Sequence, residues 1–408
     1  STRVFASQGV FSPGASPGLV IIDGQNDTLP RAAEIPVGLS PGLMAITSDR
    51  KTVLVVDAVG NAVTIVNTKT ESTVGSIPMP GPAQVSPITS MVALASGAGF
   101  IAVPAAPITN ASPGAVIMIN LQTGGVIYTI SVPGAQTVAA NSTETSVLAF
   151  NPATGTITII NPSLVNTGIP FTTTVTGFDS PVGAVFSSDG NTAYVLNCGP
   201  ECGGTQASVQ PLNIATTPPT PGTPIPVNGA TVALLQGSSL YVAGNGATAA
   251  GPLCTSIPSA PATAAQHCGY LDIVNLTTMQ DPYYNNPAAE IAVTDGYHNR
   301  IDMSVNGQLF VGAKQCTNEG DVNNPSGEVR GCLAIYNTTT PSVVFPPDNG
   351  DVTGLQNFST RDVEYVVEGT RLRVYDTQTD SLLLTDFVTT GTIIFPGQVV
   401  DVKAVDFF

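Results

Sequence analysis

The chain has 408 residues, of which 42% are hydrophobic and only 10% charged, and its formal net charge is −16 at pH 7. This much apolar sequence excludes a disordered chain. The acidic balance excludes nucleic acid as a partner, because neutralising phosphates requires clustered Lys and Arg. No uninterrupted apolar run reaches the roughly 18 residues that a membrane span needs, so we expect none.

Charge is also unevenly distributed along the sequence. Between Lys69 and Arg300 there is no Lys or Arg, and there are only nine Asp or Glu residues. The surface of this stretch must therefore consist of hydroxyl and amide side chains, which indicates an extracellular protein. We expect a secreted, periplasmic or cell-surface location with the signal peptide already removed, because strand-like sequence begins at Arg3.

A short β-rich motif that ends in Asn or Asp recurs eight times in chain order. Its last residues are Asp23, Asn67, Asn120, Asn161, Asn213, Asn275, Asn337 and Asp376. The spacings of 44, 53, 41, 52, 62, 62 and 39 residues bracket the roughly 40–50 expected for one propeller blade. The terminal Asn or Asp tolerates left-handed backbone and caps the turn that follows.

Each motif is the third strand in a group of four. In the second group we expect strands over 43–46, 53–56, 63–66 and 73–77, and helical periodicity is absent throughout. The sequence therefore predicts an all-β fold, a β-propeller of four-stranded blades that forms one domain over residues 1–408. Eight blades are preferred, and seven are possible if one group has been divided wrongly.

The two ends of the chain explain how such a propeller closes. The first group has only three strands, expected over 4–6, 19–22 and 32–35, whereas Val399–Val405 is a strand without a group. We expect the segment 398–408 to complete the first blade by pairing with the N-terminal strands. This pairing would leave no sheet edge open to solvent.

Two groups resemble the repeats of a known family. The segments Pro36–Gly38, Ala45–Asp49 and Val53–Asp57 carry the resemblance in the second group, and Pro181–Ala184 and Tyr194–Asn197 carry it in the fifth. The chain is similar here to the bacterial YVTN-type, YncE-like β-propellers. The resemblance implies the fold and an exported location, but it implies no single activity.

The six cysteines form three local pairs, each between the second (B) and third (C) strands of its blade. The pairs are Cys198 with Cys202, Cys254 with Cys268, and Cys316 with Cys332. Locality and an exported context favour these pairs over the other possible connectivities. We expect three stapled B–C loops on one face, where they either form a binding surface or only prevent long loops from fraying.

Only two histidines occur, which excludes a multi-histidine metal site and leaves little room for a Ser-His-Asp triad. His298 opens an innermost strand together with Arg300 and Asp302. If the protein is an enzyme, these three residues are the candidates for catalysis at the mouth of the central channel. Otherwise they are a solvated channel lining.

Calcium is the only cofactor that the sequence suggests. Two segments on the expected B–C face are rich in hard oxygen ligands, although neither has a complete calcium-loop signature. The candidate ligands are Asn318, Glu319, Asp321, Asn323 and Glu328 in one segment, and Asp348 and Asp351 in the other.

The missing catalytic sets and the stapled loops favour a non-catalytic binding or assembly scaffold at the cell surface. Its partner would be a protein or a glycan, and self-association is possible. Two alternatives stay open: a lactonase-like or other hydrolase that uses the channel mouth, and a subunit of a surface layer or filament.

Overall fold

The computed structural model describes residues 2–9, 16–30, 34–80, 88–106, 113–246, 269–316, 319–320, 329–346, 350–385 and 397–406. Within them the chain is all β apart from two 3-10 helices, η1 (Pro162–Leu164) and η2 (Gly199–Cys202). The strands build a β-propeller with eight four-stranded blades, which confirms the predicted fold class. In this part of the chain no helix is long and apolar enough to cross a membrane.

The chain divides into two compact units. The first comprises Ser1–Gly177, Pro181–Asn191 and Phe387–Phe408, and the second comprises Phe178–Ser180 and Thr192–Asp386. In the first unit, the first blade contains β34 (Gln398–Ala404), β1 (Arg3–Gly9) and β2 (Gly18–Asp23), and the second contains β3 (Pro41–Ile46), β4 (Thr52–Asp57), β5 (Ala62–Asn67) and β6 (Ser72–Pro78). The third blade contains β7 (Ser90–Ala93), β8 (Ala98–Val103), β9 (Ala115–Asn120) and β10 (Gly125–Ser131). The fourth contains β11 (Thr137–Ala140), β12 (Val147–Asn151), β13 (Thr156–Ile160) and β14 (Thr172–Thr176), and the unit also includes β15 (Pro181–Phe186).

The second unit continues the same order. It contains β16 (Thr192–Asn197), β17 (Ser208–Asn213), β18 (Thr220–Pro221) and β19 (Ile225–Pro226) of the fifth blade, and the sixth blade contains β20 (Val232–Gln236), β21 (Ser239–Asn245), β22 (Gly269–Asn275) and β23 (Ala292–Val293). The seventh blade contains β24 (Tyr297–Met303), β25 (Gln308–Lys314), β28 (Leu333–Asn337) and β29 (Ser342–Val344), and a small hairpin is formed by β26 (Glu319–Gly320) and β27 (Val329–Arg330). The eighth blade contains β30 (Val352–Asn357), β31 (Val363–Glu368), β32 (Arg371–Asp376) and β33 (Ser381–Thr385).

The core lies between blades and is supplied mainly by the two middle strands of each sheet. These strands are buried on both faces, so they read as continuous apolar runs, whereas outer strands such as β6 and β10 are largely exposed. Leu54 and Val56 of one blade, for example, pack in one cluster with Ile101 and Val103 of the next. Blade-to-blade packing therefore carries the stability, as in other repeat architectures.

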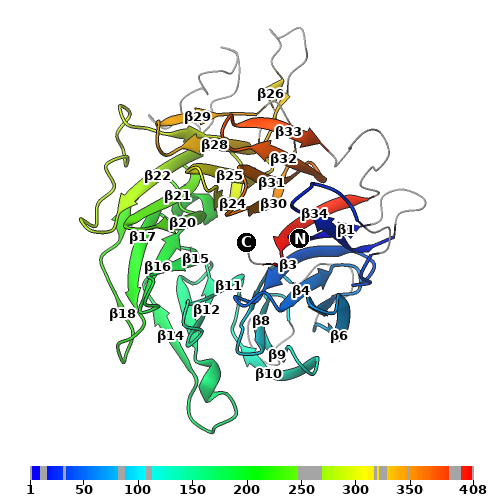
Figure 1. Cartoon of the computed structure of the whole chain (residues 1–408). Helices are drawn as coiled ribbons and strands as arrows, with labels where there is room; N and C mark the ends of the chain where they lie inside the picture. The colour runs from blue at the N-terminus through cyan, green and yellow to red at the C-terminus, as the bar shows by residue number, and fades with distance from the viewer. Residues whose placement is uncertain are drawn as a thin grey trace. The chain divides into compact units, whose positions relative to one another are not determined.

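The predicted pairing of the two chain ends is confirmed. Strand β34 runs antiparallel to β1, with Val4 opposite Ala404 and Ala6 opposite Val402, and Figure 1 shows the red β34 against the dark-blue β1. The expected fourth strand over 32–35 is shorter than predicted in its described part. Only Ile35 pairs there, as an isolated bridge to Leu19, and residues 31–33 lie outside the described part.

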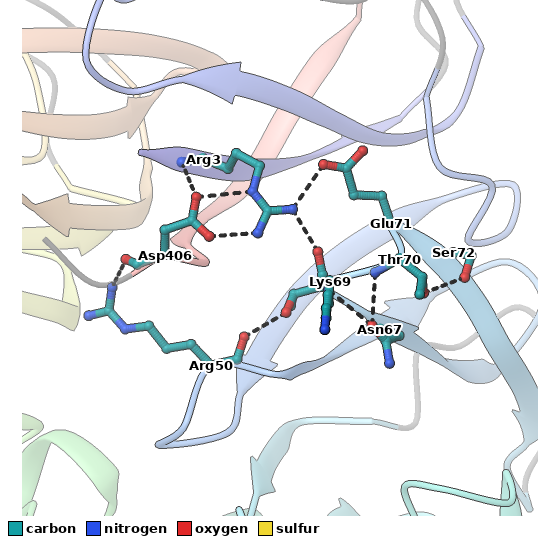
Figure 2. Close-up of polar contacts among 9 residues, drawn as sticks. Arg3, Arg50, Asn67, Lys69, Thr70, Glu71, Ser72 and Asp406 are labelled. Atoms are coloured by element: carbon teal, nitrogen blue, oxygen red, sulfur yellow. Dashed lines mark hydrogen bonds and ion pairs between the residues drawn. The ribbon is translucent and has the colours of Figure 1, made fainter. Parts of the chain in front are cut away.

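A set of charged side chains fastens this closure (Figure 2). Arg3 donates from Nε and Nη2 to the carboxylate of Asp406, at 3.0 and 2.6 Å, and from Nη1 to Glu71 Oε1 at 2.9 Å. Partial burial alone would raise the pKa of Asp406, but the hydrogen bonds and charge of Arg3 outweigh it and hold that pKa below its ordinary value. The side chain of Arg3 thus joins the C-terminal segment to the second blade.

All eight Asn and Asp motif residues lie at or directly after the end of a third strand, as predicted. Their side chains cap the following turn: Asn67 Oδ1 accepts hydrogen bonds from the amides of Lys69 and Thr70, and Asn120, Asn275, Asn337 and Asp376 repeat this pattern. The left-handed backbone, however, lies four residues later, for example at Glu71 (φ 51°). The motif residue itself is still strand, and only the far side of its turn requires positive φ.

Candidate functional site

The candidate site lies on the face of the second unit that carries the B–C loops. Cys198 and Cys202 form a disulfide between β16 and β17, and Cys316 and Cys332 form another between β25 and β28. Both predicted pairings are confirmed, including their position between the second and third strands. Cys254 and Cys268 lie outside the described residues. Two disulfides in the described chain are consistent with an extracellular protein.

The first disulfide closes a tight loop that presents one carboxylate to the next blade. Glu201 lies in η2 between the two cysteines, and its carboxylate accepts hydrogen bonds from Asn245 N at 2.9 Å and Asn245 Nδ2 at 3.2 Å. Asn245 ends β21, and its Nδ2 also donates to the carbonyl of Gly296 at 2.8 Å. A B–C loop, the end of a second strand and the connection before β24 therefore meet at one point.

This network continues to the second disulfide. Gly296 has a left-handed backbone (φ 89°), and a Cβ atom there would lie 2.5 Å from the carbonyl oxygen of Lys314 and 2.8 Å from Cys316 Cα. Only glycine fits this close approach. Next to Cys316, the amide of Gln315 donates to Asp351 Oδ1 at 2.8 Å. The two stapled loops are thus parts of one connected surface.

Glu201 is the electrostatically unusual member of this surface. Its burial raises its pKa to about 7, since two hydrogen bonds from Asn245 only partly offset the loss of hydration. The Oδ1 atom of Asn245 is shielded from solvent and accepts no hydrogen bond within the described residues. The carboxylate of Glu201 and the side-chain oxygen of Asn245 have therefore lost hydration that their hydrogen bonds do not fully replace. Such uncompensated burial of polar groups is typical of functional sites.

Tyr297 adds an aromatic side chain to the same surface. It is the first residue of β24, directly after Gly296, and 41% of its surface is exposed. Partial burial and the nearby carboxylate of Glu201 raise its pKa. Glu201, Asn245 and Tyr297 together offer a hydrogen-bonding edge beside an exposed aromatic face, a combination that suits recognition of a partner.

The residues expected at the channel mouth, His298, Arg300 and Asp302, differ in their burial and in their hydrogen-bond partners. His298 is completely buried, and its Nε2 bonds to the carbonyl of Thr294 at 2.7 Å. Burial lowers its pKa to about 4, so the ring is neutral at pH 7. Arg300 donates from Nε to the carbonyl of Thr353 at 2.7 Å and from Nη1 to its own neighbour Asn299.

Asp302 belongs to a different group of contacts. Its carboxylate accepts hydrogen bonds from the backbone amide of Asn357 at 3.1 Å and from the Asn357 side chain at 2.5 Å. Glu364 is completely buried beside it, and burial together with the charge of Asp302 raises the pKa of Glu364 well above its ordinary value. No hydrogen bond between any two of the side chains of His298, Arg300 and Asp302 occurs within the described residues.

Most of the calcium candidates lie outside the described residues. These are Asn318, Asp321, Asn323, Glu328 and Asp348, and the side chain of Glu319 is likewise not described. Asp351 is exposed and uses Oδ1 to fix the amide of Gln315. Within the described part of the chain, no three acidic, cysteine or histidine side chains converge as a metal site would require. Calcium binding therefore stays a prediction.

Sequence reasoning identified the face but not the residues that organise it. Glu201 could have been singled out, because it is the one acidic residue inside the 198–202 loop and one of only nine in the stretch without Lys or Arg. Nothing in the sequence, by contrast, places Asn245 or Gly296 next to that loop. Their contact depends on how successive blades pack, which the strand pattern does not specify.

Comparison with known proteins supports the fold. No protein-family model and no curated protein sequence matches the chain. The dihydro-heme d1 dehydrogenase NirN is similar over 99% of this chain and 75% of its own, with a TM-score of 0.64 at 11% identity. A eukaryotic initiation factor matches over 99% and 98% (TM-score 0.55, 12% identity).

A putative 6-phosphogluconolactonase from Bacteroides uniformis is also similar, over 99% of both chains, with a TM-score of 0.50 at 13% identity. At such low identities these likenesses show the β-propeller fold alone. The YVTN-type relationship suggested by the repeats stays a prediction.

Proposed function

We propose that this protein is an extracellular binding module that recognises a protein or glycan with the disulfide-bearing face of its second unit. The observation that carries this proposal is the connection from Glu201 through Asn245 and Gly296 to the Cys316 loop. Loops that are cross-linked and hydrogen-bonded to one another lose little conformational entropy on binding, so their contacts translate into affinity. The exposed ring of Tyr297 supplies the apolar contact area that recognition needs.

The chemistry of this face favours binding over hydrolysis. Glu201 is a carboxylate with a pKa near neutrality, and no described histidine or cysteine thiol lies beside it to serve as a nucleophile or second base. At His298, burial and a low pKa leave a neutral ring without access to solvent. Among the described residues no specific contact favours the hydrolase alternative or the surface-layer alternative, and both stay hypotheses.

The test is a binding screen of the full-length chain against immobilised glycans and against extracellular proteins from the same source. We expect a ligand whose affinity falls at least about tenfold in Tyr297→Ala and also falls in Glu201→Gln. The matched control is Tyr128→Ala, because Tyr128 is equally exposed (40%) but lies on an outer strand of the first unit. A ligand that binds both variants as tightly as the wild type would contradict the proposal, as would turnover of a lactone that is lost in Arg300→Ala.

A further inference from the structure

The outer edges of two neighbouring blades in the second unit leave an open cleft. Their fourth strands are reduced to two residues each: β18 and β19 in one blade and β23 in the other. Pro221 and Pro226 within these short strands have no amide hydrogen with which to extend a ladder. Between the segments 222–226 and 275–284 the structure has a cleft of about 790 Å³, within the range of roughly 300–1,000 Å³ of ligand sites.

One wall of this cleft is an aromatic and aliphatic platform. Tyr284 and Met279 are 36% and 40% exposed, and Pro211 and Pro224 line the opposite side. The ring of Tyr284 is held in place, because its hydroxyl donates to Gln206 Oε1 of the neighbouring blade at 3.2 Å. An exposed aromatic ring with a fixed orientation is a stacking surface prepared in advance.

The backbone on both sides of Tyr284 is fixed as well. Asn228 accepts a hydrogen bond from the amide of Asn285 at 3.2 Å and donates to the carbonyl of Tyr283 at 3.3 Å. Asn228 is itself anchored by the completely buried carboxyl of Asp272, which accepts from its N and Nδ2 atoms at 2.7 Å each. This support explains why an irregular segment can keep a defined shape at a sheet edge.

Most polar side chains that line the cleft are uncharged, namely the hydroxyls of Thr223 and Thr278 and the amides of Asn275 and Gln280. The side-chain amide of Gln280 and the Nδ2 atom of Asn275 make no hydrogen bond within the described residues, although both side chains line the cleft. The one ionisable acid in the lining is Asp281, which uses Oδ1 to accept from the amide of Tyr283 at 2.9 Å. The lining has no Lys, Arg or His, so it offers nothing to neutralise a phosphate, sulfate or carboxylate ligand.

We propose that this cleft binds a neutral oligosaccharide. Sugar rings present apolar C–H faces that stack on aromatic and aliphatic side chains, and hydroxyl groups that pair with amide donors and acceptors. Tyr284 and Met279 provide the first kind of contact, and Gln280 and Asn275 provide the second. The proposal does not rest on the proposed function at Glu201 and Tyr297, because it depends on other residues.

The test is titration calorimetry of the full-length chain with a panel of neutral hexasaccharides: cello-, malto-, xylo-, manno-, laminari- and N-acetylchitohexaose. We expect at least one to bind with a Kd of about 10 μM to 1 mM. Tyr284→Ala should weaken that binding at least about tenfold, and Gln280→Ala should weaken it by a smaller factor. Tyr284→Phe keeps the ring but loses the hydrogen bond to Gln206, so its affinity should fall by less than that of Tyr284→Ala.

The matched control is Tyr128→Ala, a similarly exposed tyrosine on an outer strand of the first unit. It should leave oligosaccharide affinity unchanged. The proposal is overturned if no member of the panel binds, if Tyr284→Ala binds as tightly as the wild type, or if Tyr128→Ala reduces the affinity as much as Tyr284→Ala does. Loss of partner binding in Tyr297→Ala with intact sugar binding would separate this cleft from the proposed function.

Discussion

Replacing Glu201 by Gln should stabilise the protein above neutral pH. Burial raises the pKa of Glu201 from an ordinary 4.5 to about 7, and a rise of about 2.5 units corresponds to on the order of 3 kcal/mol between the ionised and protonated forms. Gln removes the charge but can accept only one of the two hydrogen bonds from Asn245, which costs about 1–1.5 kcal/mol. We therefore expect a net gain of about 1–2 kcal/mol at pH 8.

The sign of the pH dependence follows from the direction of the pKa change. The folded state holds the Glu201 proton more tightly than the unfolded state, so this group favours folding most below pH 4.5. That contribution is lost as the pH rises from 4.5 to about 7. Urea unfolding, followed by tyrosine fluorescence because the chain has no Trp, should show the wild type losing stability over this window and Glu201→Gln losing less.

A matched control comes from Glu144, which has the opposite electrostatics. Partial burial would raise its pKa, but hydrogen bonds from the amides of Ala95 and Ser96 outweigh this effect and hold the pKa below its ordinary value. Glu144→Gln should therefore destabilise at pH 8, and its effect should fade as the pH falls through the folded-state pKa. If Glu201→Gln destabilises equally at pH 5 and pH 8, the raised pKa is refuted.

Three further measurements test other parts of the structure. In NMR titration, His298 should stay neutral from pH 8 down to about 5 and titrate near pH 4, so a midpoint near 6.5 would contradict its burial. In urea unfolding, the coupling energy between Arg3→Met and Asp406→Asn should be about 1–2 kcal/mol. This is less than the coupling of a buried ion pair, because both side chains are partly exposed. A coupling near zero would be inconsistent with the bonded geometry. Cys316→Ser with Cys332→Ser should lower stability by about 3 kcal/mol, and an unchanged unfolding midpoint would show that the disulfide does not constrain the unfolded chain.

The strand order of this fold could be predicted because the signals that specify it are local. An apolar run buried on both faces needs no knowledge of its neighbours, and an Asn that caps its own turn, such as Asn67 or Asn337, acts within three residues. Even the pairing of residues 398–404 with the N-terminus follows from counting strands. Repeat folds can be predicted from sequence because such local strand and turn signals agree with the overall fold.

The site could be predicted only as far as its face. The cysteine pairs are local, so their loops and their end of the blade followed from strand counting, whereas the contact between Glu201 and Asn245 joins residues of different blades. The buried position of His298 was missed for a different reason: polar residues at the start of an inner strand were interpreted as solvated, although Thr294, four residues earlier, supplies a partner. Contacts between repeats depend on loop insertions that follow no period.

One strand, β22, passes from one proposed site to the other, and we expect the two sites to act independently. Strand β22 begins at Gly269, opposite Asn245 and hence next to Glu201, and it ends at Asn275, which lines the cleft beside Tyr284. Six residue steps of extended chain separate these ends by about 20 Å. Tyr284 lies nearer to the first site, because its hydroxyl donates to Gln206 in the loop that also holds Glu201. It shares no hydrogen bond with Glu201, Asn245 or Tyr297 within the described residues, so the effects should be additive. The double variant Glu201→Gln with Tyr284→Ala should therefore show the oligosaccharide affinity of Tyr284→Ala alone, and any further loss would mean that the ligand reaches the disulfide-bearing face.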